Sequence, residues 1–141
     1  MKKILTIALT AVLALSLVAC GGGIKDGTYT AEAAEASHDW FDTLSVTYKD
    51  GKVVEAIYDA KDAAGVLKST KTAEEYPMEV PLTEWMPKLN ENIVKAGTAD
   101  KIEAVAGATN SSNAAKALMK AIEENAKKGN TETAKVAMPK E

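Results

Sequence analysis

Apolar and polar residues alternate most clearly on either side of an Asp-Gly pair near the middle of the chain. Three apolar residues share one face of the first extended segment: Leu44, Val46 and Tyr48. Asp50-Gly51 has the composition of a two-residue hairpin turn, and the returning segment 53–58 is apolar on both faces. The pattern predicts a β-hairpin over residues 43–59, with its second strand inside a sheet instead of at an edge.

Two later segments repeat apolar residues at the spacing of an amphipathic helix. The first helix is expected from Leu82, with Thr83 as its N-cap and Gly97 as its end. The second is expected over residues 111–127 and ends at Gly129. Its buried stripe should consist of Ala114, Ala115, Leu118, Met119, Ile122 and Ala126.

The segments between these elements carry weaker patterns. Asp26-Gly27 is typical of a turn before a strand, and the apolar run 102–105 predicts a short last strand. Residues 60–81 have no sustained period, which predicts a long loop and a natural wall for a binding site. Residues 130–141 are polar enough for a disordered tail.

Together these elements predict an α+β fold. We expect a small twisted antiparallel sheet with a central hairpin, packed by two helices, the last of which follows Gly107-Ala108-Thr109. The chain length supports one domain, which is expected to span residues 25–129.

Residues 1–19 have the composition of a cleaved lipoprotein signal peptide. Lys2 and Lys3 form its charged start, an apolar stretch follows, and residues 17–20 end it as a lipobox. Cys20 is then the expected lipidated N-terminus, carrying palmitate, and residues 20–24 form a glycine-containing tether. A further hypothesis makes the cleaved peptide itself a peptide signal.

The composition excludes several kinds of site. Cys20 is the only cysteine and His38 the only histidine, which excludes a disulfide, a thiol nucleophile, a haem or iron–sulfur centre and a zinc site built on several histidines. The chain has no arginine, and after signal removal 15 lysines stand against 20 acidic residues, a net charge of −5. Nucleic-acid binding is therefore not expected. His38 is expected to be a surface turn residue without a catalytic role.

The junction over residues 103–112 is the main candidate site. Its sequence, Glu-Ala-Val-Ala-Gly-Ala-Thr-Asn-Ser-Ser, leads into the second helix, and a helix N-terminus presents backbone amides to an anion such as a phosphate. Gly107 lacks a side chain, which lets a ligand or a second protein approach the main chain. An ordinary helix start remains the alternative, because Asn110, Ser111 and Ser112 are all common N-cap residues.

These residues resemble the motif of the FMN-binding domain family, which is Asp-x-x-[Ser/Thr]-Gly-Ala-Thr followed closely by Ser. In that family a separate FAD-dependent flavin transferase esterifies the motif threonine to the phosphate of FMN, so the resemblance implies that Thr109 is the flavin acceptor. The opening Asp-Gly-Thr-Tyr, the Trp40 region, the hairpin and the segment 59–69 are also similar to single-domain lipoproteins of this family. The resemblance covers most of the chain after the signal peptide.

Two positions depart from the family's usual motif. Glu103 stands where the family has Asp, and Ala106 stands where it has Ser or Thr. Glu103 keeps a carboxylate with one more methylene group, whereas Ala106 loses a hydroxyl. The departures leave noncovalent FMN binding open. They also motivate a second hypothesis, a cofactor-free surface lipoprotein that acts as a binding or immunogenic module.

The phosphate of FMN is expected to rest on neutral donors, because the chain has no arginine. The backbone amides from Ala108 to Ser112 and the hydroxyls of Ser111 and Ser112 are the expected donors, with Lys68 beside them. Glu103 and Gly107 complete the motif end of this site.

The ring of FMN is expected to stack on Trp40, which lies in a polar segment. Tyr58 is a further candidate for this contact, and Trp85 is expected in the core instead. Asp59, Lys68 and Ser69 match the family's polar loop, so the resemblance implies that they line the flavin or a partner surface.

The resemblance implies a monomeric electron carrier, not an enzyme with a substrate of its own. FMN is its expected cofactor, and no metal is expected. The expected partners are the flavin transferase, a membrane quinone or dehydrogenase as electron donor, and the lipid bilayer. We expect the protein to be lipid-anchored at the extracytoplasmic face of the cell membrane.

Overall fold

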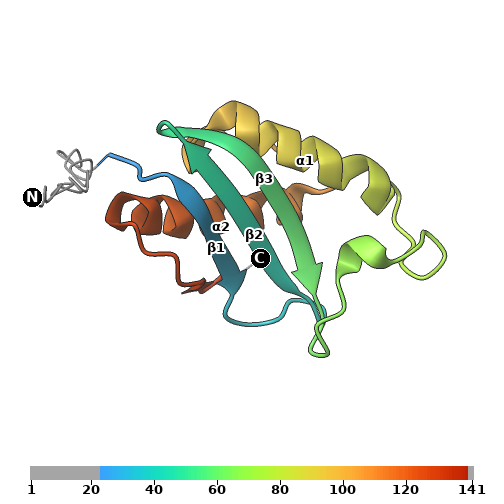
Figure 1. Ribbon diagram of the computed structural model, residues 1–141. Helices are drawn as coiled ribbons and strands as arrows, with labels where there is room; N and C mark the ends of the chain where they lie inside the picture. Colours follow the sequence, from blue (N-terminus) through green and yellow to red (C-terminus); the bar gives the residue numbers. More distant parts are fainter. Residues whose placement is uncertain (1–22, 140–141) are drawn as a thin grey trace, which may run out of the picture.

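The computed structural model describes residues 23–139, and Figure 1 shows their arrangement. The expected signal peptide and Cys20 lie outside the described residues. In chain order the elements are β1 (Gly27–Ala33), β2 (Phe41–Lys49), β3 (Lys52–Lys61), the 3₁₀ turn η2 (Lys68–Thr70), α1 (Leu82–Ala96), the 3₁₀ turn η3 (Ala99–Lys101), α2 (Thr109–Lys128) and β4 (Ala134–Val136). The predicted α+β class is confirmed.

Within residues 23–139 the strands form one four-stranded sheet in the order β3-β2-β1-β4. β2 pairs antiparallel with both β1 and β3, whereas β4 pairs parallel with β1, so the sheet is mixed and not wholly antiparallel. The predicted hairpin is present. Asp50 and Gly51 form its turn with φ angles of 53° and 77°, and this backbone matches the twist of two antiparallel strands.

β3 lies at an edge of the sheet, so the prediction of an inner strand was wrong. Its apolar residues divide between the two faces: Ala56 and Tyr58 are buried, whereas Val54 is 52% and Ile57 48% exposed. Asn90 of α1 covers one outward amide, because its Oδ1 accepts a hydrogen bond of 2.7 Å from the N–H of Tyr58. A side chain of the covering helix therefore takes the place of a neighbouring strand.

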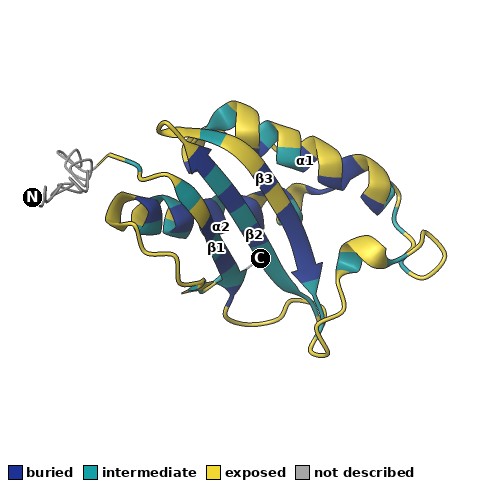
Figure 2. Cartoon of the chain, viewed as in Figure 1, coloured by how far each residue is buried: buried dark blue, intermediate teal, exposed yellow. Residues whose placement is uncertain are grey.

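Both helices lie on the same face of the sheet (Figure 1). α1 packs on β3, and α2 packs on β1 and β2. The predicted stripes are buried, with Met86, Leu89 and Ile93 on α1 and Ala114, Ala115, Leu118, Met119, Ile122 and Ala126 on α2. Burial of each large aliphatic side chain contributes about 1.5–3 kcal/mol. The outer sides of the helices and most connecting loops remain exposed (Figure 2), and no helix in the described part is long and apolar enough to cross a membrane.

α1 begins at Leu82 as predicted but with a different N-cap, α2 begins two residues earlier than predicted, and both helices end where predicted. Pro81, not Thr83, is the N-cap of α1, and its carbonyl accepts the first helical hydrogen bonds. α2 begins at Thr109, so the polar residues at 110–112 lie inside its first turn and none of them is the N-cap. Gly97 and Gly129 end the helices with left-handed φ angles of 72° and 70°.

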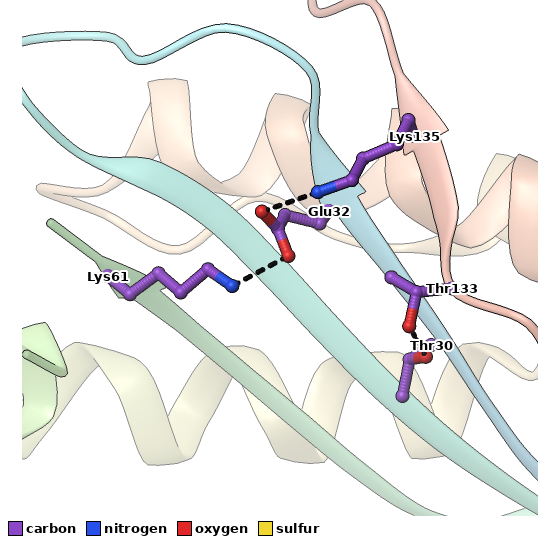
Figure 3. A network of polar contacts seen from close by, with 5 residues as sticks. All are labelled: Thr30, Glu32, Lys61, Thr133 and Lys135. Carbon is purple, nitrogen blue, oxygen red and sulfur yellow. Dashed lines mark hydrogen bonds and ion pairs between the residues drawn. The ribbon is translucent and has the colours of Figure 1, made fainter. Parts of the chain in front are cut away.

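Residues 134–136 form β4 inside the segment that we expected to be disordered. Figure 3 shows the side chains that attach it to the neighbouring strands, on the sheet face that the helices leave open. Glu32 on β1 accepts hydrogen bonds of 2.8 Å from Lys61 and from Lys135. The hydroxyls of Thr30 and Thr133 lie 2.8 Å apart. Partners that lie a hundred residues away in the sequence order the tail, and its own polar composition does not reveal them.

The strand predicted at residues 102–105 is not formed. An irregular segment follows η3 there, although Ile102 and Val105 are buried as apolar residues should be. The N–H of Val105 donates to Oγ of Ser112 at 3.0 Å. The backbone group that a strand neighbour would satisfy is therefore satisfied by a helix side chain.

A tight turn over residues 105–108 joins this segment to α2. The N–H of Ala108 donates to the carbonyl of Val105 at 3.0 Å, and Gly107 has a φ of 82°. A Cβ on Gly107 would lie 2.6 Å from Cγ2 of Val80. Val80 therefore fills the space that the missing side chain leaves, while Gly107 itself remains exposed.

Gly107→Ala is expected to destabilise the domain by about 2–4 kcal/mol, because a left-handed backbone and a clash with Val80 both oppose a side chain there. Urea unfolding measures the free energy. Gly51→Ala is the matched control, since Gly51 has a φ of 77° but no heavy atom within 4 Å of an added Cβ. Gly51→Ala should lose only the stability that the left-handed backbone costs. Adding Val80→Ala to Gly107→Ala should recover part of the lost free energy of unfolding. Equal losses of unfolding free energy in Gly107→Ala and Gly51→Ala would contradict a clash with Val80.

Glu32→Gln is expected to loosen β4, because it removes the charge that both lysines share. Burial opposes ionisation, but the bonds from Lys135 and Lys61 outweigh it and lower the pKa of Glu32. Their stabilisation is thus complete above the ordinary pKa of Glu and is lost as the pH falls through the lower folded value. The N–H of Ala34 donates to the carbonyl of Val136, the last residue of β4, so hydrogen exchange at this amide measures the loosening.

Hydrogen exchange of this amide should lose up to about fivefold in protection in Glu32→Gln, as expected for a partly exposed ion pair. Glu55→Gln, which changes an exposed residue of β3, serves as the control and should leave the amide unchanged. A protection factor that is equal in wild type and Glu32→Gln would argue against this role of the ion pairs.

Candidate functional site

A cavity of about 540 Å³ opens at the N-terminus of α2. Five parts of the chain build its wall: the turn before β2, the start of β2, the loop between β3 and α1, the start of α2 with the two residues before it, and the segment after β4. The long loop over residues 60–81 therefore forms a wall of the cavity, as the sequence predicted.

The start of α2 supplies the polar end of the cavity. Thr109 is the first residue of the helix, is exposed and lines the cavity. Ser111 lines it within the first turn, and Asn113 lines it one turn after Thr109. Ala108 is the N-cap and makes no side-chain capping bond. Since the first amides of a helix have no acceptor within the helix, this end presents N–H groups and the positive end of the helix dipole.

Ser112 holds the turn against the helix without lining the cavity. Its hydroxyl is fully buried, accepts the N–H of Val105 at 3.0 Å and donates to the carbonyl of Ala108 at 2.8 Å. Both hydrogen-bonding functions of the hydroxyl are used inside the protein. Ser112 is therefore a positioning residue for Ala108 and Thr109, not the phosphate donor that we expected.

Lys68 and two aromatic rings form the opposite wall. The rings of Trp40 and Tyr76 meet edge to face at 90°, with 5.9 Å between their centroids. Nζ of Lys68 lies 5.2 Å from the centroid of Trp40 and 4.4 Å from that of Tyr76. At these distances the ammonium group is attracted to both ring faces. The cavity thus has one aromatic side that also carries a positive charge.

Asp59 positions Lys68 from outside the cavity. Its Oδ2 accepts the hydroxyl of Ser69 at 2.6 Å, and its Oδ1 accepts the N–H of Ser69 at 3.1 Å. Asp62 accepts the amides of Ala64 and Val66, which closes the loop that precedes η2. These bonds fix η2, the turn on which Lys68 stands. Asp59 does not belong to the wall of this cavity, because it faces the open side of the sheet.

A strained turn over residues 37–40 positions Trp40. Ser37 and Trp40 exchange two backbone hydrogen bonds, of 2.8 and 3.0 Å. Between them His38 and Asp39 have φ angles of 51° and 69°, which few residues other than glycine adopt. His38 is an exposed turn residue, as the sequence predicted, and it also lines the cavity.

Asp42 and Tyr58 form a polar contact at the floor of the cavity. The hydroxyl of Tyr58, which is only 2% exposed, donates to the carboxylate of Asp42, which lines the cavity. Burial raises the pKa of Asp42, although the hydrogen bond from Tyr58 and the charge of Lys68 act in the opposite direction. Burial also raises the pKa of Tyr58 well above its ordinary value.

The structure brings six of the expected cofactor residues together in the cavity wall: Trp40, Lys68, Gly107, Ala108, Thr109 and Ser111. Glu103 is exposed outside this wall, and its backbone carbonyl accepts a hydrogen bond from Asn92. The aromatic rings of Tyr58 and Trp85 are buried in the core, so neither is placed to stack on a ligand.

Several residues of the cavity wall were not identified from the sequence. Tyr76 and Met78 belong to the irregular loop, where no periodicity indicates which side chains point inward. Asn113 lies one helical turn after Thr109, a spacing that identifies it once the helix start is known. Met138 and Pro139 reach the cavity only because β4 attaches the tail to β1.

These residues fit FMN. The volume lies within the usual range of small-molecule sites, roughly 300–1,000 Å³. An uncapped helix start suits a phosphate, and the aromatic side with Lys68 suits a flat, electron-poor ring. Among the described residues no group of three His, Cys, Asp or Glu side chains is placed to hold a metal ion.

Comparison with known proteins identifies the family of this chain. The model of the FMN-binding domain family matches residues 41–123, which include η2 and the motif before α2. The "15 kDa lipoprotein" of Treponema pallidum (strain Nichols) is 30% identical over 127 residues, which cover 85% of this chain and 89% of that protein.

Two solved structures share the fold. A crystal structure of a protein from Clostridium perfringens has a TM-score of 0.75 and 31% identity, and the match covers 82% of this chain and 99% of the other. A solution NMR structure of a protein from Clostridium thermocellum has a TM-score of 0.50 and 24% identity, covering 78% and 95%, and shows likeness of fold alone. From the family match and the site geometry, the chain belongs to the FMN-binding domain family and its cofactor is FMN.

Proposed function

We propose that this protein is a lipid-anchored electron carrier at the extracytoplasmic face of the membrane, with FMN bound covalently through Thr109. The observation that supports the covalent bond most directly is the position of Thr109. Its side chain is exposed at the uncapped start of α2, and it faces a cavity with an aromatic opposite wall. A phosphoester at this oxygen would place its charge at the positive end of the helix dipole.

Attachment requires a second enzyme, a flavin transferase that uses FAD. Thr109 supplies the ester oxygen and loses its hydroxyl proton. The pyrophosphate bond of FAD breaks, and AMP is the leaving group. The exposure of Thr109 supports such an encounter, because a partner enzyme must reach the hydroxyl from solvent.

The residues of the cavity divide the work of holding FMN. The amides at the start of α2 and the side chains of Ser111 and Asn113 face the phosphate end. Trp40 and Tyr76 offer ring faces, and Lys68 adds positive charge beside them. Met138 and Pro139 complete the wall after β4.

FMN supplies the redox chemistry, because it accepts two electrons and can release them one at a time. Covalent attachment keeps such a cofactor from diffusing away outside the cytoplasm. The lipobox ending at Cys20 and the name of the Treponema relative support a lipid anchor. We propose a membrane quinone or dehydrogenase as the electron donor, and no substrate turnover by the protein itself.

The two departures from the family motif leave the cavity intact. Glu103 and Ala106 are both exposed, and neither belongs to the cavity wall. Their substitution therefore removes no contact with a bound FMN. For this reason we favour the flavoprotein over the cofactor-free lipoprotein.

Coexpression with a flavin transferase should yield a fluorescent protein band on a denaturing gel and an intact mass increased by one FMN. Thr109→Val should abolish both signals, because it keeps the shape of threonine and removes the hydroxyl. Thr109→Ser keeps a hydroxyl and should retain modification. Fluorescence that survives in Thr109→Val would exclude Thr109 as the acceptor.

The same assay tests the two departures. Glu103→Asp and Ala106→Ser restore the family's usual motif at exposed positions, so folding should not change. Equal yields of flavin in the restored and native proteins would indicate that the native motif suffices for the transferase. If flavin appeared in the restored protein alone, covalent attachment in the native chain would be refuted.

Electron transfer can be measured with the flavin-loaded protein and membrane vesicles that contain reduced quinone. The oxidised flavin absorbance should bleach when vesicles are added anaerobically and return with a soluble acceptor. Vesicles without reduced quinone and the Thr109→Val protein are the controls. A flavin that stays oxidised with reduced quinone, and equally with dehydrogenase-containing membranes, would contradict the carrier role.

A further inference from the structure

Asp42 lines the cavity and accepts a hydrogen bond from the buried Tyr58. It lies on the helix-facing side of β2, two residues before Leu44, which pairs with Tyr58 of β3. The Tyr58 hydroxyl donates to the Asp42 carboxylate across the strands. Ser111, in the first turn of α2, lines the same cavity as Asp42 and Thr109. The hydrogen bond from Tyr58 therefore ends on a carboxylate in the wall of the cavity that Thr109 also lines.

The direction of the hydrogen bond between Tyr58 and Asp42 is fixed by the two groups. A tyrosine hydroxyl has a single proton, and here that proton is directed to Asp42. Because burial keeps Tyr58 protonated, its hydroxyl remains a donor when Asp42 is charged. The carboxylate is thus stabilised by this hydrogen bond and by the charge of Lys68, and Asp42 also lines the cavity.

Four parts of the chain bring titratable or charged groups to Asp42 or to the same cavity. Tyr58 comes from β3, Lys68 from η2, Tyr76 from the loop after η2 and His38 from the turn before β2. Lys68 favours the charged carboxylate, whereas burial favours the neutral acid. Asp42 is therefore held between two opposing effects, and a change of charge in the cavity will alter its protonation.

We propose that Asp42 couples a proton to the reduction of FMN: its carboxylate binds one proton when the bound cofactor is reduced and releases it on reoxidation. The proposal rests on FMN occupying this cavity. In the balanced step, the donor supplies two electrons. One proton from solvent goes to the reduced cofactor, which keeps one additional negative charge, and a second proton from solvent converts the Asp42 carboxylate to the neutral acid. No bond forms between Asp42 and FMN. Negative charge gained in the cavity raises the pKa of a nearby carboxylate, and by linkage protonation of that carboxylate favours reduction.

The coupling has a defined pH window. It begins at the pKa of Asp42 in the oxidised protein, which burial already places above the ordinary value for Asp. It ends at the higher pKa of Asp42 in the reduced protein. Between the two values, reduction takes up one additional proton, so the midpoint potential falls more steeply with pH.

Redox titration of the flavin-loaded protein over a series of pH values tests the proposal. Wild type should show the steeper segment, and Asp42→Asn should lose it while keeping the shape of the side chain. Tyr58→Phe should move the segment to higher pH, because it removes a hydrogen bond that favours the carboxylate. His38→Gln is the control for the histidine of the cavity wall and should keep the segment. A profile that is unchanged in Asp42→Asn, or lost in His38→Gln, would overturn the proposal.

A second measurement uses the full chain without flavin, so that it remains informative if Thr109 is not modified. Carbon NMR of the Asp42 carboxyl should give a higher pKa in the folded chain than in the urea-unfolded chain. Tyr58→Phe should raise the folded value further, and the NMR spectrum reports whether that variant folds. Absence of flavin in the protein would reject the proposed function. Equal pKa values of Asp42 in the folded and unfolded chains would reject the role of Asp42.

Discussion

The buried hydroxyl of Ser112 is the contact on which the site depends. It accepts a hydrogen bond from the N–H of Val105 and donates one to the carbonyl of Ala108. One side chain therefore fixes both ends of the turn over residues 105–108. Without it, the buried N–H of Val105 would have to find another acceptor, at a cost of about 1–3 kcal/mol. The turn in turn sets Thr109 as the first residue of α2. A neutral hydroxyl thus orients the cofactor attachment point.

The packing of α2 on β1 and β2 gives that turn its direction. Because the apolar stripe of the helix is buried on the sheet, its axis is fixed and its N-terminus opens into the cavity. The opposite wall is held by a different mechanism. Asp59 fixes η2 through Ser69, and η2 carries Lys68 between two aromatic rings. One wall is therefore positioned by apolar burial and the other by hydrogen bonds in a loop.

The charge distribution suits a cofactor whose charge changes. The site uses helix amides and one lysine, and a half-buried carboxylate lies at its floor. A cavity lined by several cations would bind the phosphate more strongly, but it would also favour the reduced form regardless of pH. The opposing effects of burial and Lys68 on Asp42 leave room for protonation to respond to the cofactor.

The sequence by itself determined the local elements and the motif. The alternation from Leu44 to Tyr48 and the Asp50-Gly51 turn specified the hairpin, the helical spacing specified both helices, and the motif identified Thr109 and the cavity residues next to it. These features depend on neighbours close in the chain, which is why they can be read from it. Tertiary structure decided where each element lies. It placed β3 at the edge under Asn90, ordered β4 through Glu32, and turned Ser112 inward and Asp42 toward the cavity. Those outcomes depend on partners far away in the sequence, so no local pattern can specify them.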